Sequence, residues 1–210
     1  MKITLNHDAK KRSKLSKEFY LRNDVIQLSK DLLGKFLITN KNGIVTGGMI
    51  TEVEAYAGVT DKASHAFGGR RTPRTEIMFA EGGFGYVYLC YGIHHLFNVV
   101  TNEKDIPHAI LVRAIEPIIG IEEMLKRRNK INLQPNLTSG PGSMSEALGI
   151  KVNDLGIDLT GEEIFIEDRG IKISTKEIVS TKRIGVDYAG NDALRNYRFY
   201  IKGNKFISRP

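Results

Sequence analysis

The amino-acid sequence predicts an α+β fold built as one domain, with a largely antiparallel sheet flanked by helices. The chain has 210 residues, of which 41% are hydrophobic, and this is enough to bury one sizeable core. Most apolar runs are short, alternate with polar residues and are separated by glycine-containing turns, as hairpin-connected strands are. No internal repeat, low-complexity segment or linker divides the sequence, which favours a single domain.

Helix signals occur at three places. Asn23-Asp24 can cap a helix that stops at Gly34, because these side chains accept hydrogen bonds from the first turn and glycine suits a helix end. Pro117 fits the first turn of a helix that runs towards the basic residues around Arg128. The expected helices cover residues 25–33, about 117–128 and about 145–148.

Strand signals alternate with turn signals in the rest of the chain. Asn42-Gly43 is typical of a two-residue hairpin loop, because both residues tolerate positive φ angles. Residues 57–74 are polar and rich in glycine, and we expect a functional loop there. The expected strands cover residues 36–39, 44–56, 84–91, 96–100, 109–114, 164–167, 171–174, 178–180 and 198–201.

The first residues of the chain differ in composition from the rest. Residues 1–16 are polar and lysine-rich, so we expect a flexible basic arm there, no secretory signal, and the single domain at 17–210. No run approaches the ~18–20 apolar residues of a membrane span. Cys90 is the only cysteine and lies in an apolar run, which predicts a buried structural thiol in a reducing, intracellular setting.

The charge balance points to a polyanionic partner. The chain carries 31 basic and 24 acidic residues, a formal net charge of +7. Nucleic acid is the commonest partner of so basic a protein. A second interpretation stays open, that of an enzyme that is merely basic, because net charge reports on association and not on fold.

Two carboxylates on the expected strand 44–56 are the first candidates for chemistry. Glu52, Glu54 and Tyr56 would share one face of the strand, because successive side chains point to opposite faces. Such a pair at the entrance of a glycine-rich loop could supply a general base. An exposed polar strand face has the same pattern, so both interpretations stay open.

The histidines and glycine motifs narrow the chemistry further. His94 and His95 are adjacent and have no cysteine or carboxylate partners at metal-site spacing, so we expect no metal. His65 lies in the loop after the Glu52–Tyr56 segment and is either functional or incidental. The sequence contains no serine-hydrolase elbow, no phosphate-binding P-loop and no dinucleotide fingerprint.

Aromatic and basic side chains suit a nucleic-acid partner. Packing in a half-buried strand explains Tyr86, whereas Tyr91, beside Gly92 at a turn, could project as a wedge between base pairs. Flat rings can also hold an extruded base. Basic residues that could contact phosphates, or simply form a solvated surface, are Arg70, Arg71, Arg74 and the cluster at 126–130.

Blocks of these residues resemble the alkyladenine (3-methyladenine) DNA glycosylase family, and bacterial members in particular. The similarity runs in order from about residue 20 to the carboxyl end. Four collinear blocks carry it: Glu52–Gly58 (EVEAYAG), Ser64–Arg74 (SHAFGGRRTPR), Tyr86–Asn98 (YVYLCYGIHHLFN) and Leu111–Pro117 (LVRAIEP). Two weaker blocks follow at Gly140–Ile150 (GPGSMSEALGI) and Arg183–Gly190 (RIGVDYAG). The chain differs from mammalian members at Ile93-His94, which follow the Tyr91-Gly92 turn.

The resemblance implies a DNA-repair enzyme that flips a damaged purine out of duplex DNA and hydrolyses its bond to deoxyribose, without cutting the strand. It implies a curved sheet, a hairpin that inserts into DNA, no cofactor or metal, a monomer without membrane partners, and a cytoplasmic, nucleoid-associated location. By the same resemblance, Glu54 deprotonates the water that Arg113 and the Ile184 carbonyl hold. The other implied roles are a base-binding pocket of Tyr56, His65, Tyr88 and Asn98, an intercalating Tyr91, and DNA-backbone contacts by Arg70, Thr72 and Arg74.

Two other classes of function are weighed against this one. A nucleic-acid-binding module without catalysis would need only the tyrosines and arginines, and the combination of Glu54 with Arg113 argues against it. A structural or RNA-associated domain would need only the basic arm and the basic cluster. Release of a base from damaged DNA separates the enzyme from both.

Overall fold

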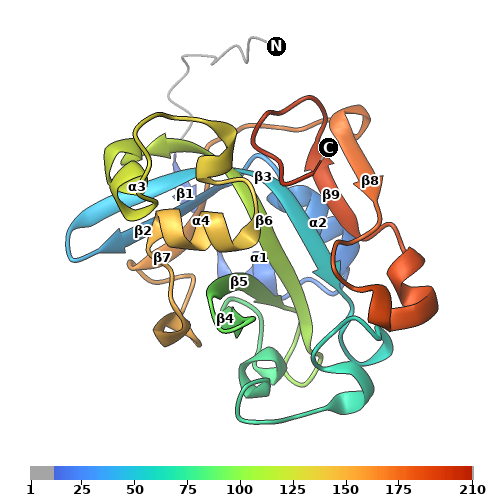
Figure 1. Cartoon of the computed structure of the whole chain (residues 1–210). Coiled ribbons are helices and arrows are strands. Elements are labelled where there is room, and N and C mark those ends of the chain that lie inside the picture. The colour runs from blue at the N-terminus through green and yellow to red at the C-terminus, as the bar shows by residue number, and fades with distance from the viewer. Residues whose placement is uncertain (1–11, 210) are drawn as a thin grey trace.

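The computed structural model describes residues 12–209, and within them nine strands form one curved sheet with antiparallel pairing throughout (Figure 1). The strands are β1 (Ser13–Lys14), β2 (Phe36–Lys41), β3 (Ile44–Tyr56), β4 (Gly85–Cys90), β5 (His94–Thr101), β6 (His108–Ile119), β7 (Ile164–Asp168), β8 (Ile178–Thr181) and β9 (Arg198–Ile201). Their order is β1-β7-β2-β3-β6-β5-β4, and β9 pairs with both β3 and β8. The predicted fold class is confirmed.

Helices cover both faces of the sheet. They are α1 (Lys17–Tyr20), α2 (Val25–Leu32), α3 (Ile121–Arg127) and α4 (Pro141–Leu148). In the view of Figure 1, α4 lies in front of the sheet and α2 behind it. Helix α2 contacts β3 and β6, and α4 contacts β5 and β6. Short 3₁₀ helices cover Gly58–Thr60, Phe67–Gly69, Glu76–Phe79, Pro135–Leu137, Val152–Asp154, Thr175–Glu177 and Asp187–Leu194. Between residues 12 and 209, no helix has the length and apolar character needed to cross a membrane.

Helix α2 begins and ends as its sequence predicts. The carboxylate of Asp24 accepts hydrogen bonds from the main-chain N–H groups of Ile26 and Gln27, at 3.0 and 2.9 Å. These bonds satisfy two of the donors that the first turn of a helix leaves open. Gly34, just beyond the helix, has a φ of 84°, which glycine adopts without steric cost. The apolar face of the helix packs into the main core.

Strand β3 runs through the middle of the sheet and changes partners along its length. It follows a hairpin turn at Asn42-Gly43, as predicted, and its predicted bounds are confirmed. On one side its first half pairs with β2 and residues 52–54 pair with β9, and on the other side β6 pairs with it from Gly47 to Tyr56. Two irregularities of register flank Glu52, and such bulges bend a strand. The bend places the segment from Glu52 to Tyr56 between β6 and β9.

Strand β6 contains the proline that the sequence predicted to begin a helix, and that prediction is wrong. Pro117 pairs with Gly48 of β3 beside a bulge in β6, where the ladder is interrupted and a residue without an N–H is tolerated. A Cβ atom on Gly48 would stand 2.3 Å from the main-chain oxygen of Glu116, so this glycine lets the two strands approach. Helix α3 starts only after Gly120.

Two further segments differ from the prediction. Residues 171–174 are not a strand. The side chains of Ile171 and Ile173 instead pack beside Gly34 at the end of α2, so their alternating apolar pattern reflects burial rather than pairing. Helix α4 begins at Pro141, earlier than the predicted start near 145, because proline at the first helical turn loses no hydrogen bond.

The prediction of a flexible arm over residues 1–16 meets the described part of the chain only at its end, where a short strand is found. Residues 1–11 lie outside the described part of the chain, whereas Ser13 and Lys14 form β1 and pair with β7. The ammonium group of Lys14 also donates a hydrogen bond to the main-chain oxygen of Gly161, at 2.8 Å. Strand pairing, which composition does not reveal, therefore joins the end of this segment to the sheet.

Candidate active site

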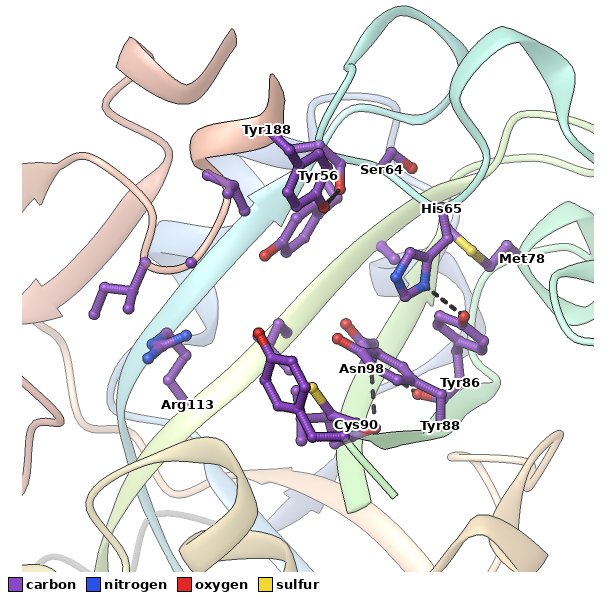
Figure 2. A pocket seen from close by; sticks show the side chains of 18 of the residues that line it. Tyr56, Ser64, His65, Met78, Tyr86, Tyr88, Cys90, Asn98, Arg113 and Tyr188 are labelled. Atoms are coloured by element: carbon purple, nitrogen blue, oxygen red, sulfur yellow. Dashed lines mark hydrogen bonds between the residues drawn. The ribbon is translucent and has the colours of Figure 1, made fainter. Parts of the chain in front are cut away.

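A cavity of about 340 Å³ lies where β3 ends, between the loop that follows β3, the β4–β5 hairpin and the segment around Ile184. Figure 2 shows Tyr56 and Tyr188 facing His65 and Tyr88 across the cavity, with Arg113 set apart from the rings. Its lining brings together seven residues that the sequence singled out: Tyr56, His65, Tyr88, Tyr91, Asn98, Arg113 and Ile184.

The carboxylate of Glu54 is fully buried and does not itself line the cavity. It lies behind three residues that do: Tyr56, Arg113 and Ile184. One oxygen accepts a hydrogen bond from the main-chain N–H of Ile184, at 2.8 Å. The other accepts one from the Tyr56 hydroxyl, at 2.9 Å, and lies 3.3 Å from Nη1 of Arg113. The interpretation of this strand face as an exposed polar surface is wrong, because Glu54 and its neighbour Glu52 both have no exposed surface.

The guanidinium of Arg113 lies between two carboxylates. Its Nε donates to Glu52 at 3.0 Å, while its Nη1 is paired with Glu54. Burial works against the charged form, yet the negative charges of Glu54 and Glu52 raise the pKa of Arg113 above its ordinary value. Glu52 also accepts from Nε of Arg198 on β9, at 2.7 Å, so the bend in β3 is held by a balanced set of two acids and two bases.

The ring of Tyr56 joins the carboxylate to the aromatic wall. Its hydroxyl is bonded to Glu54, and the guanidinium carbon of Arg183 lies 4.9 Å from the centre of its ring. Burial and the nearby charge of Glu54 raise the pKa of Tyr56 well above its usual value. The phenol therefore keeps its proton and donates a hydrogen bond to the carboxylate.

A second buried ion pair fixes the two loops that carry Ile184 and His65. Both Nη atoms of Arg183 donate to the carboxylate of Asp61, at 2.5 and 2.8 Å, and Nη1 also donates to the main-chain oxygen of Ala55, at 2.9 Å. Both side chains of the pair are fully buried. Since Arg183 directly precedes Ile184 in the chain, this pair sets the position of Ile184 beside Glu54.

His65 forms the opposite wall together with two tyrosines. Its Nδ1 lies 2.7 Å from the hydroxyl of Tyr86 and 3.5 Å from Nη2 of Arg74, and its ring is 4.7 Å from that of Tyr88 in an edge-on arrangement. Burial, followed by the charges of Arg74 and Arg70, lowers the pKa of His65 to about 4. Because a guanidinium can only donate, Nδ1 accepts and the neutral ring carries its proton on Nε2. Packing explains Tyr86, as predicted, since it is 2% exposed.

The strands β4 and β5 supply the floor of the cavity. Asn98 is buried, and its Nδ2 donates to the main-chain oxygen of Tyr86 at 3.0 Å. Cys90, predicted to be a buried structural thiol, is only partly buried and lines the cavity. The prediction is wrong because Cys90 pairs with His94 at the hairpin end of β4, beyond the core.

Tyr91 stands at the tip of the β4–β5 hairpin. Three residues, Tyr91 to Ile93, connect the paired residues Cys90 and His94. Tyr91 and Gly92 have φ angles of 50° and 74°, and the main-chain N–H of Ile93 donates to the main-chain oxygen of Cys90, at 3.2 Å. These angles belong to a type I′ turn, in which a bulky residue at the first position is uncommon. The side chain of Tyr91 is 90% exposed, so the hairpin presents a bare aromatic ring beside the cavity.

The predicted backbone contacts lie in an adjoining hollow of about 500 Å³, which shares His65 and Tyr188 with the cavity. Arg70 and Arg74 line it with exposed side chains, and Thr72 lines it with a partly buried one. Arg71, which the sequence placed in the same basic group, is instead held by the carboxylates of Glu76 and Asp105, at 2.7 and 2.9 Å.

Several residues of the site were not predicted from the sequence. The spacing from Glu52 to Glu54 placed both on one face without revealing that Glu52 anchors Arg113. Arg183 and Tyr188 stand in a block with weak family resemblance, whereas Asp61 carried no signal. In the stretch 12–209, no three His, Cys, Asp or Glu side chains gather closely enough to hold a metal ion.

Comparisons with known proteins place the chain in a family. The family described as methylpurine-DNA glycosylase matches residues 18–205. A protein of Clostridium acetobutylicum, named as a candidate 3-methyladenine DNA glycosylase, is 48% identical over 93% of this chain and 97% of its own length. Proteins of the same description from Clostridium perfringens and Bacillus cereus are 45% and 44% identical, over 93% and 90% of this chain and 99% and 97% of their own lengths.

The family match extends over nearly the whole described part of the chain, and the relatives align along almost their full length. The matched region includes every residue named above for the cavity, from Tyr56 to Tyr188. The chain therefore belongs to the methylpurine-DNA glycosylase family, and it is a DNA-repair enzyme of the class that hydrolyses N-glycosyl bonds.

Proposed function

We propose that the chain is a monofunctional DNA glycosylase that extrudes a damaged purine from duplex DNA, holds it in the cavity beside Tyr56, and hydrolyses its bond to deoxyribose. The observation that carries the proposal is the pairing of Glu54 with Arg113, 3.3 Å apart, because Arg113 lines an aromatic cavity of about 340 Å³. That volume is within the range of small-molecule sites, about 300–1,000 Å³. The enzyme acts as a monomer on the DNA of the nucleoid.

The walls of the cavity suit a purine that carries a positive charge. An N-alkylated purine is cationic, and the faces of Tyr56 and Tyr88 attract a cation. Burial raises the pKa of Tyr88, so its ring stays neutral, and the lowered pKa of His65 keeps the imidazole uncharged. The base therefore meets two neutral, electron-rich rings and a neutral imidazole, whose Nε2–H can donate a hydrogen bond to it. Asn98, held by its bond to Tyr86, limits what fits beside the base.

Extrusion depends on the hairpin and on the adjoining hollow. A stacked base cannot be reached by the enzyme, so the nucleotide must leave the duplex at a cost of a few kcal/mol. Tyr91, exposed at the hairpin tip, fills the gap that the base leaves behind. Arg70, Thr72 and Arg74 contact the phosphates on either side and hold the backbone in register. Damaged bases cost least to extrude, which adds selectivity.

The chemical step uses the buried carboxylate. As the N-glycosyl bond breaks, its electron pair leaves with the base, and positive charge develops on the sugar. The carboxylate of Glu54 stabilises that charge and accepts a proton from the water whose oxygen bonds to the sugar carbon. Arg113 and the main-chain carbonyl of Ile184 hold the water. A cationic base leaves readily, so no strong acid is required.

The product is an abasic site in an intact strand. Cutting the strand would require an amine that forms a Schiff base with the sugar. Within residues 12–209, the lining of the cavity includes no lysine. We expect the DNA to be nicked only after later treatment with alkali.

Replacement of Glu54 by glutamine tests the proposal. The substrate is DNA methylated with a tritiated reagent, and the released bases are separated by chromatography. We expect wild-type protein to release methylated purines, and Glu54→Gln to bind the same DNA within a few-fold while base release falls by orders of magnitude, about 10²–10⁴-fold for a lost general base. Glu103→Gln, an exposed change of the same kind, should match wild type. Release by Glu54→Gln at the wild-type rate would show that another group performs the chemistry.

A further inference from the structure

A segment near the end of the described chain reaches the catalytic pair from outside the aromatic cavity. Residues 203–209 form neither helix nor strand. They pass the buried face of Glu52, the carboxylate that anchors Arg113. The main-chain N–H and the hydroxyl of Ser208 both donate to Glu52, at 2.5 and 2.7 Å. The same hydroxyl oxygen accepts a hydrogen bond from Nη2 of Arg113, at 3.2 Å.

Ser208 completes the set of partners around Arg113. Each of the three guanidinium nitrogens has a different one: Nε has Glu52, Nη1 has Glu54 and Nη2 has Ser208. A guanidinium between two carboxylates could otherwise rotate into a two-bond pair with either of them, a geometry that arginine favours strongly. The bond to Ser208 opposes that rotation and leaves Nη1 directed at Glu54.

The segment is itself tied to three strands. The Thr51 hydroxyl of β3 donates to the main-chain oxygen of Phe206, at 2.5 Å. The amide of Asn204 donates to Glu116 of β6, at 2.8 Å, and Nη2 of Arg198 on β9 donates to the main-chain oxygen of Arg209. Ser208 is therefore held between fixed points, and the next residue, Arg209, lines the cavity.

We infer that Ser208 is a positioning residue for the reaction: its hydroxyl bridges Glu52 and Arg113 and so fixes the arginine against Glu54 and the attacking water. The inference rests on the proposed function, since it assigns to Ser208 the placement of a group that acts in that mechanism. Ser208 does not touch the base or the sugar and acts only through Arg113. Its loss therefore changes the rate of the chemical step and leaves DNA binding intact.

Single-turnover base release from the methylated DNA, with enzyme in excess, tests the inference together with binding to the same DNA. We expect Ser208→Ala to slow release by about 10- to 100-fold, the range for a misplaced catalytic group or a lost bond to a charged one, with binding changed less than twofold. Ser208→Thr keeps the hydroxyl and should restore most of the rate. Ser180→Ala on β8 and Lys205→Ala in the same segment, both at exposed positions, should match wild type.

A purely structural role for Ser208 predicts a different result. Ser208→Ala would then lower the melting temperature but release bases at the wild-type rate wherever it is folded, and the inference would be overturned. If Ser208→Ala does not fold, Ser208→Cys, which fills the same space with a weak donor, should give a rate below that of Ser208→Thr; equal rates for the two would overturn the inference.

The same experiment separates the two levels of argument. An inactive wild-type protein would overturn the proposed function and this inference together. If the wild type is active, Glu54→Gln is inactive and Ser208→Ala is unimpaired, the proposed function is supported and only the positioning role of Ser208 is refuted.

Discussion

Tyr91 and Asn42 occupy the same position in two hairpin turns of the sheet. Each directly follows the last residue of a strand, with φ of 50° and 53°, and each precedes a glycine with φ of 74° and 79°. Asparagine is favoured in this left-handed conformation and tyrosine is not, by about 1 kcal/mol or more. The chain thus keeps a strained, exposed ring beside its cavity, where asparagine would be more stable. Strain of this kind gathers at functional sites.

Tyr91→Asn should separate stability from function. We expect the free energy of unfolding in urea to stay the same or rise by up to about 1 kcal/mol, because the new residue suits the turn. Release of methylated purines from duplex DNA should fall, since nothing fills the gap left by the extruded base. The reverse change, Asn42→Tyr, should cost about 1 kcal/mol and leave base release unaltered. A fully active Tyr91→Asn protein would contradict the role of the ring.

The pH dependence of stability should report on His65. Its pKa is about 4 in the folded chain against an ordinary value of 6.5, so the unfolded chain takes up the proton first as the pH falls. The contribution of the neutral His65 to the free energy of unfolding is fully present above pH 6.5 and is lost progressively as the pH falls towards 4. Between pH 7.5 and pH 5, wild type should lose about 2 kcal/mol more of its unfolding free energy than His65→Gln. His94→Gln, at an exposed position, serves as the control; an identical pH dependence for wild type and His65→Gln would refute the assignment.

The ion pair of Asp61 with Arg183 should carry a large share of the stability. Asp61→Asn leaves a buried guanidinium without its counter-charge, and breaking a buried pair in this way costs about 3–5 kcal/mol. The double variant Asp61→Asn with Arg183→Met removes both charges and should recover part of that loss. Urea unfolding measures each variant, with Asp187→Asn at an exposed position as the matched control. A loss below 1 kcal/mol for Asp61→Asn would mean that water or another group compensates Arg183.

The cap of α2 offers a test that is independent of function. Asp24→Ala removes the acceptor for two main-chain N–H groups and should lower the unfolding free energy by about 1 kcal/mol. Asp24→Asn retains an oxygen in the same place and should cost little. Base release at 25 °C should be the same for both variants and wild type. If alanine and asparagine have equal effects, the hydrogen bonds at this cap do not contribute.

The elements predicted correctly were those whose bounds depend on residues close together in the sequence. The bounds of β3 follow from the Asn42-Gly43 turn and from the alternation after it, and the start of α2 follows from its cap. Pro117 misled because a proline at a helix start and a proline beside a strand bulge look alike locally, and only the approach of Gly48 decides between them. Residues 171–174 misled because burial against α2 gives isoleucine the same spacing as strand pairing.

Within the candidate site, too, some residues could be predicted from the sequence and others could not. The resemblance of short blocks selected Glu54 and Arg113, and the folded chain brings their side chains within 3.3 Å. The partners of Glu52 were beyond such reasoning, because Arg198 and Ser208 follow it by 146 and 156 positions. The sequence around Arg198 and around Ser208 contains no local pattern that predicts a contact with β3. The same holds for Asp61, whose partner Arg183 is 122 positions away.

The long reach of the Glu52 contacts has a consequence for the order of folding. Until Arg198 and Ser208 arrive, burial of Glu52 would leave its carboxylate poorly neutralised, at a cost of several kcal/mol. The second half of β3 can therefore close over its acids only after two large loops of chain have been brought together, which is a slow event. If Glu54 acts as proposed, a nascent or partly folded chain has no positioned carboxylate, and we expect release of damaged bases only from a chain whose sheet is fully assembled.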